Sequence, residues 1–388
     1  MYLNNKLNYK ISGLAWRGFA LPFRTPFIAS DAHANIKYGL ILCLTTENGS
    51  IGVGESSPIG PGTSKNIGRI SEELSNIAPT LLHNNSVNLA TRLKTLNLSP
   101  QLLFGIETAI LDLEGKISGL PISSMIGGKP TSFEVNALIA SDDSKEIISE
   151  SRYAISQGFR TLKIKIGHGP QQADEEMLSA LREVVGPDIK IRLDPNQAWT
   201  IPQAIESIKR LEKFDIEYIE QPVSARIPNH LAQVRSSVAI PIAADEALGS
   251  LQDLERIIAQ DSADILIIKA SRLGGISKSL EIIDSAKRVG KEIVITSSLE
   301  SDIGIAASTH LVSSLPNSHL AQGLSTSLLF NDNLSTLGVI PISGRLAPLN
   351  GSGLGVHLDM PKLAQYGLPI MGHVGQLPHD WAQTKRSG

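Results

Sequence analysis

The sequence has almost no cysteine, and its single cysteine, Cys43, excludes a disulfide within the chain. Nothing in the chain therefore requires an oxidising compartment. The first residues, MYLNNKLNYKISG, lack the apolar core of a secretory signal, so we expect a cytoplasmic protein. No uninterrupted apolar run approaches the roughly 20 residues that a helix needs to cross a bilayer, which argues against a membrane role.

An excess of positive charge is also missing. The 388 residues include 35 Lys and Arg against 38 Asp and Glu, so the net charge of −3 offers no basic field for a nucleic acid. A chain of this length predicts one large barrel or two domains with a sizeable core. The expected partner is a small molecule, and the sequence leaves open whether the chain forms a homo-oligomer.

The first third of the chain has the pattern of an α+β unit. Strand-like segments at 6–16, 38–46 and 51–58 are followed by helical apolar spacing at 70–81 and 102–117. Asn48 and Gly49 lie between two of the strands and predict a hairpin, because both residue types accept a positive φ. Residues 330–388 return to short strands and turns, and we expect them to pack back on this unit.

Between residues 133 and 329, short apolar runs alternate with amphipathic helical patterns. The runs are 135–140, 161–167, 189–196, 216–222, 240–246, 263–270, 291–298 and 319–323. Six of them carry a polar residue near their end, namely Lys165, Asp194, Glu220, Asp245, Lys269 and Ser297. The separations of 29, 26, 25, 24 and 28 residues favour eight βα units closed into a barrel, whose strand ends converge, over an open doubly wound sheet.

Three of these strand-end residues are acids. Asp194, Glu220 and Asp245 would meet at one rim of the barrel, where they would repel one another unless they hold a cation. Oxygen donors without cysteine or histidine suit Mg²⁺, or Mn²⁺ in its place. A network of ion pairs with nearby lysines is the alternative interpretation, and the two are compatible.

The lysines point to proton transfer. Side chains alternate along a strand, so Lys163 and Lys165 both face the barrel interior, and Lys269 ends a later strand. Lysines facing each other over a metal suggest abstraction of a proton α to a carboxylate. A free lysine, with a pKa of about 10.4, is charged at neutral pH, so the base needs a nearby cation to lower its pKa. A noncatalytic, metal-stabilised binding barrel is the alternative from another class of protein.

Other motifs predict less. The glycine spacings at 52–57 and 351–355 do not lie between a strand and an N-capped helix, so they do not form a dinucleotide fingerprint. The serines at 297, 298 and 301 have no partnered histidine, which argues against a serine nucleophile. His230 and His310 lie on expected helices, where we expect packing or surface positions.

The order of the segments KIK, DPNQAW, EQP, ADE, KASRLGG and SSLESDIG resembles the enolase superfamily, specifically its muconate lactonising enzyme subgroup. LLFGIETAILDLEGKISGLPISSMIGG is also similar to the last helix of that family's capping domain. The resemblance implies an α/β fold, a (β/α) barrel of modified TIM type with an α+β capping domain. Residues 1–132 and 330–388 would form the cap and 133–329 the barrel.

The resemblance also implies roles for single residues. Lys165 would be the base, Lys163 its modulator and Lys269 the lysine on the opposite face, while Asp194, Glu220 and Asp245 would bind Mg²⁺. The expected substrate contacts are Asn196, Ser297, Ser298, Glu300 and Arg24, the last within a segment, 23–36, that would close over the barrel mouth. Serines follow the seventh strand where the mandelate racemase subgroup has a histidine base, which argues against that subgroup.

The segment SSLES at 297–301 most resembles the o-succinylbenzoate synthases of menaquinone synthesis. This implies a syn-dehydration of 2-succinyl-6-hydroxy-2,4-cyclohexadiene-1-carboxylate, in which Lys165 removes the α-proton and Lys269 stabilises the enediolate. The alternatives are N-succinylamino acid racemases, dipeptide epimerases and muconate-type cycloisomerases. The segment AQGLSTSLL at 321–329 has no acid to hold an α-ammonium group, which argues against a dipeptide substrate.

Overall fold

An antiparallel sheet carries the capping domain. The computed structural model describes residues 7, 9–29, 32–84, 89, 92–93, 95–167, 169–227, 229–315, 318–378 and 381. The sheet order is β13–β1–β2–β3, with bounds Gly367–Gly375, Ile11–Ala29, Ala32–Thr46 and Ile51–Ser56. The predicted hairpin is confirmed, because β2 pairs with β3 and Gly49 takes a φ of 79° in the turn between them.

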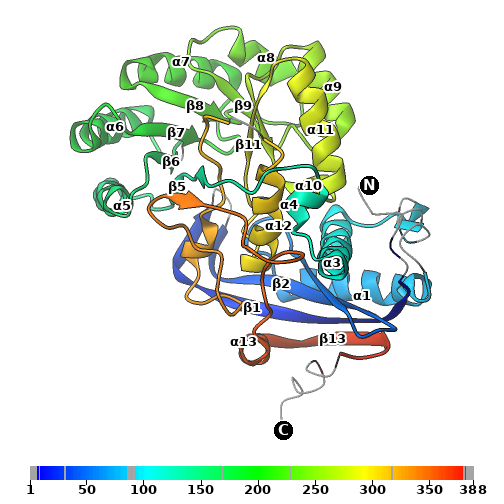
Figure 1. Ribbon diagram of the computed structural model, residues 1–388. Coiled ribbons are helices and arrows are strands. Elements are labelled where there is room, and N and C mark those ends of the chain that lie inside the picture. The colour runs from blue at the N-terminus through cyan, green and yellow to red at the C-terminus, as the bar shows by residue number, and fades with distance from the viewer. Residues whose placement is uncertain are drawn as a thin grey trace.

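Two long helices pack beside this sheet (Figure 1). They are α1, Ser64–Leu81, and α3, Pro100–Ser118, and the short α4, Ile122–Met125, follows. The backbone of α3 lies so close to β3 that a Cβ at Gly54 would be 2.0 Å from the Gly105 carbonyl oxygen. The glycines at 52 and 54 therefore allow close helix–strand packing.

Seven parallel strands form the barrel sheet, in the order β11–β10–β9–β8–β7–β6–β5. From β5 to β11 they are Ala137–Ile139, Thr161–Lys165, Lys190–Asp194, Ile216–Glu220, Ile242–Ala244, Ile265–Ile268 and Glu292–Ile295. The helices between and after them are α5 (Ser144–Ser156), α6 (Gln171–Val185), α7 (Ile201–Leu211), α8 (Asn229–Arg235), α9 (Leu251–Ala259), α10 (Ala270–Leu273), α11 (Ile276–Arg288) and α12 (Asp302–Val312). The predicted fold class is confirmed.

The eighth βα unit differs from the prediction. Residues 319–323 do not form a full strand; Gln322 bridges to Val135 and Gly323 bridges to Thr296, both in parallel. A 3-10 helix, Thr326–Leu329, follows in place of an α-helix. These bridges join the two edges of the curved sheet, so a segment too short for a strand still connects the barrel into a ring.

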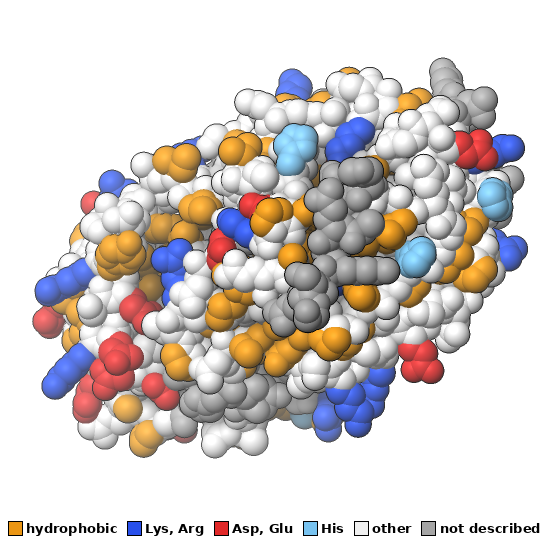
Figure 2. Space-filling view, turned by 90° about the horizontal axis from the view of Figure 1, so that it is seen from below, with side chains coloured by type: hydrophobic (Ala, Val, Ile, Leu, Met, Phe, Trp, Pro, Cys, Tyr) orange, Lys and Arg blue, Asp and Glu red, His pale blue; other side chains and the backbone are white. Residues whose placement is uncertain are grey.

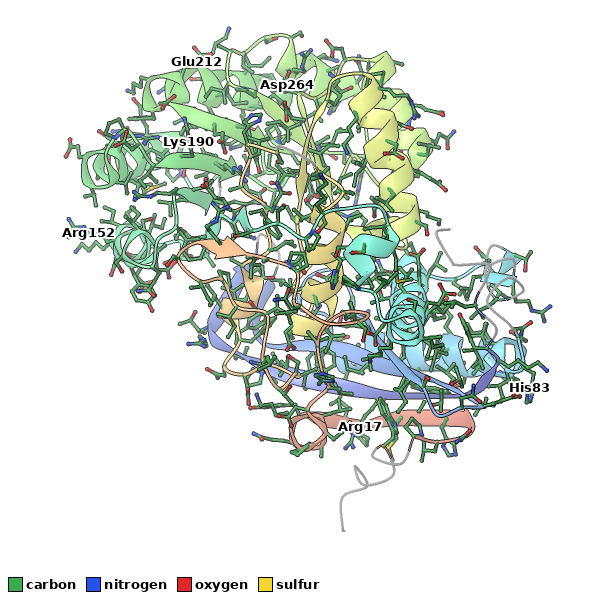
Figure 3. The ribbon with its side chains drawn as sticks, viewed as in Figure 1. Arg17, His83, Arg152, Lys190, Glu212 and Asp264 are labelled. Atoms are coloured by element: carbon green, nitrogen blue, oxygen red, sulfur yellow. The ribbon has the colours of Figure 1, made fainter. Side chains whose placement is uncertain are left out.

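The C-terminal segment contacts both parts of the molecule. β13 pairs with β1, as expected for a segment that packs back on the capping sheet, while β12 (Arg345–Leu346) pairs with β4 (Phe133–Glu134). The remaining short elements are α13 (Met360–Gln365) and a 3-10 turn, Glu212–Phe214. Figure 3 shows Arg17 and His83 at the capping sheet, far from Lys190 and Asp264 on the barrel. The domain boundaries at 132/133 and 329/330 stay a prediction.

Buried carboxylates join the cap to the barrel. Glu55 of β3 accepts hydrogen bonds from the backbone N–H groups of Ser301 and Gly304, each at 2.9 Å, at the start of α12. Glu107 of α3 accepts from the N–H of Ser277 at 3.3 Å, at the start of α11. The positive end of a helix dipole favours a carboxylate there, so these contacts hold the two domains in register.

The surface agrees with the near-neutral composition. On the face seen in Figure 2, basic and acidic side chains are interspersed with apolar and neutral ones. No helix in the described ranges is both long and apolar enough to cross a membrane.

Candidate active site

The site lies where the carboxyl ends of the barrel strands face the capping domain. A cavity of about 660 Å³ opens there, and its walls include strand ends from the barrel and residues of two capping segments, represented by Phe27 and Ile59. The ends of parallel strands converge in a barrel, so side chains far apart in the sequence meet in this space. The three predicted lysines and the acids Asp194 and Asp245 line it, while Glu220 is fully buried outside the lining and contacts Lys163.

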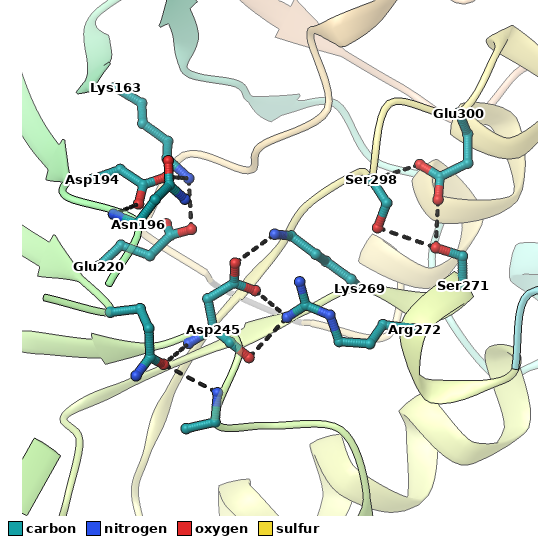
Figure 4. Close-up of polar contacts among 12 residues, drawn as sticks. Lys163, Asp194, Asn196, Glu220, Asp245, Lys269, Ser271, Arg272, Ser298 and Glu300 are labelled. Atoms are coloured by element: carbon teal, nitrogen blue, oxygen red, sulfur yellow. Dashed lines mark hydrogen bonds and ion pairs between the residues drawn. The ribbon is translucent and has the colours of Figure 1, made fainter. Parts of the chain in front are cut away.

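Lys163 holds two of the predicted metal ligands (Figure 4). Its Nζ lies 2.6 Å from Glu220 Oε1 and 2.9 Å from Asp194 Oδ2. Burial lowers the pKa of Lys163, but the two carboxylates outweigh burial and hold that pKa well above its ordinary value. Lys163 therefore remains an ammonium group, and it is a fixed cation beside Lys165.

Asp245 binds two cations. Lys269 Nζ lies 2.6 Å from its Oδ2 and Arg272 Nη1 lies 2.6 Å from its Oδ1. Burial raises the pKa of Asp245, but the charges of Lys269 and Arg272 outweigh burial and hold it below the usual range for aspartate. The carboxylate is therefore ionised, and Lys269 is anchored as its ammonium partner.

Lys165 differs from the other two lysines. Its Nζ lies 5.2 Å from the centroid of the Phe27 ring, and in the described part of the chain it makes no hydrogen bond or ion pair. Burial lowers the pKa of Lys165, and the charges of Lys163 and Lys269 lower it further, although Asp194 and Glu220 act in the opposite sense. The environment of Lys165 thus lowers its pKa from the ordinary lysine value.

Three oxygens near the strand ends have the chemistry expected for a hard cation. Glu220 Oε2, Glu246 Oε2 and Asn196 Oδ1 are buried and have no hydrogen-bond partner among the described residues. A buried oxygen without a partner is costly, and oxygen donors of this kind suit Mg²⁺. The described residues nevertheless contain no group of three or more Asp, Glu, His or Cys side chains arranged to hold a metal, since the carboxylates pair with lysines instead. The donor types fit a divalent cation, and the ion pairs are also present.

The backbone at the rim is unusual. Asn196, Gln197, Gln221 and Leu299 all have a positive φ, between 40° and 69°, although none is glycine. Non-glycine residues in this region carry strain, and such strain concentrates at functional sites. Gln221 also orders the next loop, because its Oε1 accepts hydrogen bonds from the N–H groups of Asp245 and Ala247, each at 3.1 Å.

The predicted substrate contacts divide into two groups. Asn196, Ser297 and Ser298 line the cavity. Glu300 is buried outside the cavity lining, where its Oε2 accepts a hydrogen bond from the Ser298 N–H at 2.6 Å. Arg24 is exposed, lies outside the cavity lining, and donates through Nε to the Phe330 carbonyl oxygen at 2.8 Å. Glu300 therefore supports the wall, and Arg24 binds the backbone.

The segment that was expected to close over the mouth, 23–36, is described only in part. Phe27 and Ala34 reach the cavity, and residues 30–31 lie outside the described residues. A second capping segment, 59–63, also lines the cavity and was not predicted. Three further residues at the site were not predicted, although each lies one to three positions from an assigned residue within a recognised motif: Gln221, Glu246 and Arg272.

A capped barrel with acids and lysines at its strand ends defines a class of enzymes. Two family models match this chain and confirm that it belongs to that class. Residues 20–127 match the mandelate racemase / muconate lactonizing enzyme N-terminal domain, and residues 146–362 match the enolase C-terminal domain-like family. The chain belongs to the enolase superfamily, within the group similar to muconate lactonising enzyme. It is an enolase-superfamily enzyme.

Relatives with several different activities are similar to this chain. It is 32% identical to the hydrophobic dipeptide epimerase of Enterococcus faecalis, over 71% of this chain and 79% of that protein. It is 29% identical to muconate cycloisomerase 1 of Acinetobacter baylyi, over 84% and 91%, and 33% identical to the o-succinylbenzoate synthase of Thermobifida fusca, over 55% and 65%. The muconate lactonizing enzyme from Pseudomonas fluorescens, solved with muconolactone, has a TM-score of 0.88 at 25% identity and covers 93% of this chain and 100% of that one. These activities differ from one another, so the relatives do not decide the reaction.

Proposed function

We propose that this enzyme removes a proton α to a carboxylate, with Lys165 as the base. One observation carries the proposal: among the three described strand-end lysines, Lys163 and Lys269 are anchored on carboxylates and Lys165 is not. A base must be unprotonated, and a lysine whose pKa is lowered by burial and by neighbouring cations is unprotonated more often at neutral pH.

The proposed cofactor is Mg²⁺, or Mn²⁺ in its place, with Asp194, Glu220 and Asp245 as its ligands. The unpartnered oxygens of Glu220 and Asn196 support a cation at this rim. When bound, the cation would supply positive charge beside the substrate carboxylate, where negative charge develops. Lys163 would keep Asp194 and Glu220 in place and, as a fixed cation, keep the pKa of Lys165 low.

The difference between the two cavity lysines supports a reaction that uses a single base. Lys165 would take the α-proton, whereas Lys269, held 2.6 Å from Asp245, would remain an ammonium group and stabilise the developing negative charge. The proposed reaction is that of o-succinylbenzoate synthase, in which removal of the α-proton is followed by β-elimination of hydroxide and the ring becomes aromatic. The product would serve menaquinone synthesis.

A second candidate, racemisation of N-acylated amino acids, is favoured by the fact that Lys269 also lines the cavity and could return a proton. Ser325 and Thr326 follow the eighth strand position and line the cavity. They contribute hydroxyl groups there and no carboxylate. A free α-ammonium group would therefore lack a partner there, so N-acylated substrates fit better than dipeptides. A muconate-type cycloisomerisation would also need a single proton-transfer group, because the addition of one carboxylate to the diene gives an enediolate whose α-carbon is then protonated.

A substrate panel tests the proposal. The purified enzyme with Mg²⁺ is expected to dehydrate 2-succinyl-6-hydroxy-2,4-cyclohexadiene-1-carboxylate, followed by the absorbance of the aromatic product. N-succinylamino acids, dipeptides and muconate are assayed beside it, with α-proton exchange in D₂O read by NMR. Rapid exchange of an amino acid derivative without any dehydration would contradict the synthase and favour the racemase.

The pH dependence of the reaction follows from Lys165. Its pKa is lowered from the ordinary 10.5, and only the neutral amine can accept a proton, so kcat/KM should rise with pH and level off below pH 10.5. The measurement is a profile of kcat/KM against pH, with circular dichroism at each pH to confirm that the enzyme stays folded. If kcat/KM instead falls as the pH rises towards 10.5, the assignment of Lys165 as the base is wrong.

A further inference from the structure

Lys37 is a fully buried lysine that the proposed chemistry does not use. It lies on β2 with 0% of its surface exposed, and its Nζ donates hydrogen bonds to the carbonyl oxygens of Pro58 at 2.7 Å and Gly60 at 2.5 Å. The next residue, Tyr38, donates its backbone N–H to the Pro61 carbonyl oxygen at 2.8 Å. Two consecutive residues of β2 therefore bind three carbonyl groups of one segment.

That segment, residues 57–63, connects β3 to α1, and most of it lines the cavity. Gly60 and Gly62 have φ values of 69° and 72°, and a Cβ at Gly60 would have no neighbour within 4 Å. Ile59 is 42% exposed. Packing therefore holds the tip of the segment weakly, and the hydrogen bonds from β2 determine its position.

Burial of a lysine at this position costs free energy that an apolar residue would not, so packing alone does not explain it. Burial lowers the pKa of Lys37 to about 8, although the negative charges of Glu300 and Glu55 oppose the shift. These two carboxylates are buried and come from opposite domains, and Glu300 also binds the backbone of Ser298 on the barrel wall. Lys37 thus lies in a buried charged cluster with one carboxylate from each domain.

We propose that Lys37 is a positioning residue that fixes segment 57–63 as the capping wall of the cavity and so determines which substrate side groups fit. It does not touch the reacting atoms. Its effect on substrate choice rests on the proposed function, because that part takes the cavity as the substrate site. Its effect on the segment rests on the hydrogen bonds alone.

Amide hydrogen exchange, measured by mass spectrometry, tests the effect of Lys37 on segment 57–63 without any substrate. In Lys37→Met, exchange in the peptide that contains Tyr38, whose amide donates to the Pro61 carbonyl oxygen of the segment, should speed up by about tenfold or more, while peptides of α3 keep their rates. The matched control is Lys116→Met, because Lys116 also donates to a capping-domain carbonyl, Ile51 at 3.1 Å, and pairs with Asp112 at 2.7 Å, but lies outside the cavity lining. That control should leave exchange in the Tyr38 peptide unchanged. Equal protection in Lys37→Met and the parent would overturn the proposal.

Steady-state kinetics test the effect of Lys37 on substrate choice, with whichever carboxylate substrate the panel identifies. Lys37→Met should raise KM by about tenfold and change kcat by less than about threefold, because Lys165 is untouched and the substrate wall is loosened. An unchanged KM, or a loss of kcat alone, would show that Lys37 does not position the substrate wall. If circular dichroism shows that Lys37→Met is unfolded, Lys37→Gln, which keeps an uncharged donor, takes its place in both experiments. If every substrate fails, the proposed function falls, and the exchange result still decides the role of Lys37 in the segment.

Discussion

Lys165→Ala is expected to lower kcat by about 10³-fold or more and to abolish exchange of the substrate α-proton in D₂O. The reason is that Lys165 is the cavity lysine without a carboxylate partner in the described structure, whereas Lys163 and Lys269 are held by carboxylates and cannot replace it. Because its Nζ makes no ion pair with any described residue, its removal should leave the fold intact. The measurements are steady-state kcat, exchange by NMR, and the thermal midpoint.

The matched control for that variant is Lys145→Ala, since Lys145 is an exposed lysine of α5 outside the cavity lining. It should retain the activity of the parent. Full activity in Lys165→Ala would overturn the proposed mechanism. If the parent bound carboxylates without turning over any of them, and Lys165→Ala bound them equally well, the noncatalytic binding barrel would be the better explanation.

Asp245→Asn is expected to cause the second large loss, in both activity and stability. Asp245 is 1% exposed and neutralises Lys269 and Arg272, so the amide would leave two largely buried cations without their counter-charge. Removal of one partner from a buried ion pair destabilises proteins by about 3 kcal/mol or more. The same change would remove a proposed Mg²⁺ ligand, so activity should be lost and the Mg²⁺ concentration needed for any residual activity should increase.

Chemical denaturation and a Mg²⁺ titration of activity provide the measurements for Asp245→Asn. The control is Asp261→Asn, because Asp261 also binds two cations, Arg235 and Lys291, but its side chain is 63% exposed. Solvent screens exposed pairs, so this variant should unfold close to the parent and keep its activity. An Asp245→Asn enzyme with parental stability and full activity would contradict both the ion-pair role and the ligand role.

Much of the fold could be predicted because it depends on local patterns. Alternation along 161–165 placed Lys163 and Lys165 on the same interior face, and the structure confirms that both line the cavity. The spacing of 24 to 29 residues between strand-end polar groups predicted the barrel, since each βα unit has a similar length. The Asn48-Gly49 hairpin followed from turn chemistry alone.

Other features could not be predicted from local patterns in the sequence. Residues 319–323 are apolar enough for a strand, yet only Gln322 and Gly323 bridge the sheet edges, because strand pairing depends on how the ring closes. The hydrogen bond from Arg24 to the Phe330 carbonyl joins residues 306 positions apart, and the role of Arg24 as a substrate contact stays a prediction. Segment 57–63 carries no sequence signal for cavity lining, since its position depends on hydrogen bonds from β2.

Which functional groups this enzyme has, and in what order they follow successive strands, can be predicted from the amino-acid sequence, because periodicity and motif are local properties of the chain. The tertiary structure alone decided how these groups pair. Lys163 reaches Glu220 across 57 residues and Lys269 reaches Asp245 across 24, and these contacts leave Lys165 without a carboxylate in the described structure. The physical reason is that charge pairing and pKa depend on distances of a few ångströms, which only the closed barrel establishes.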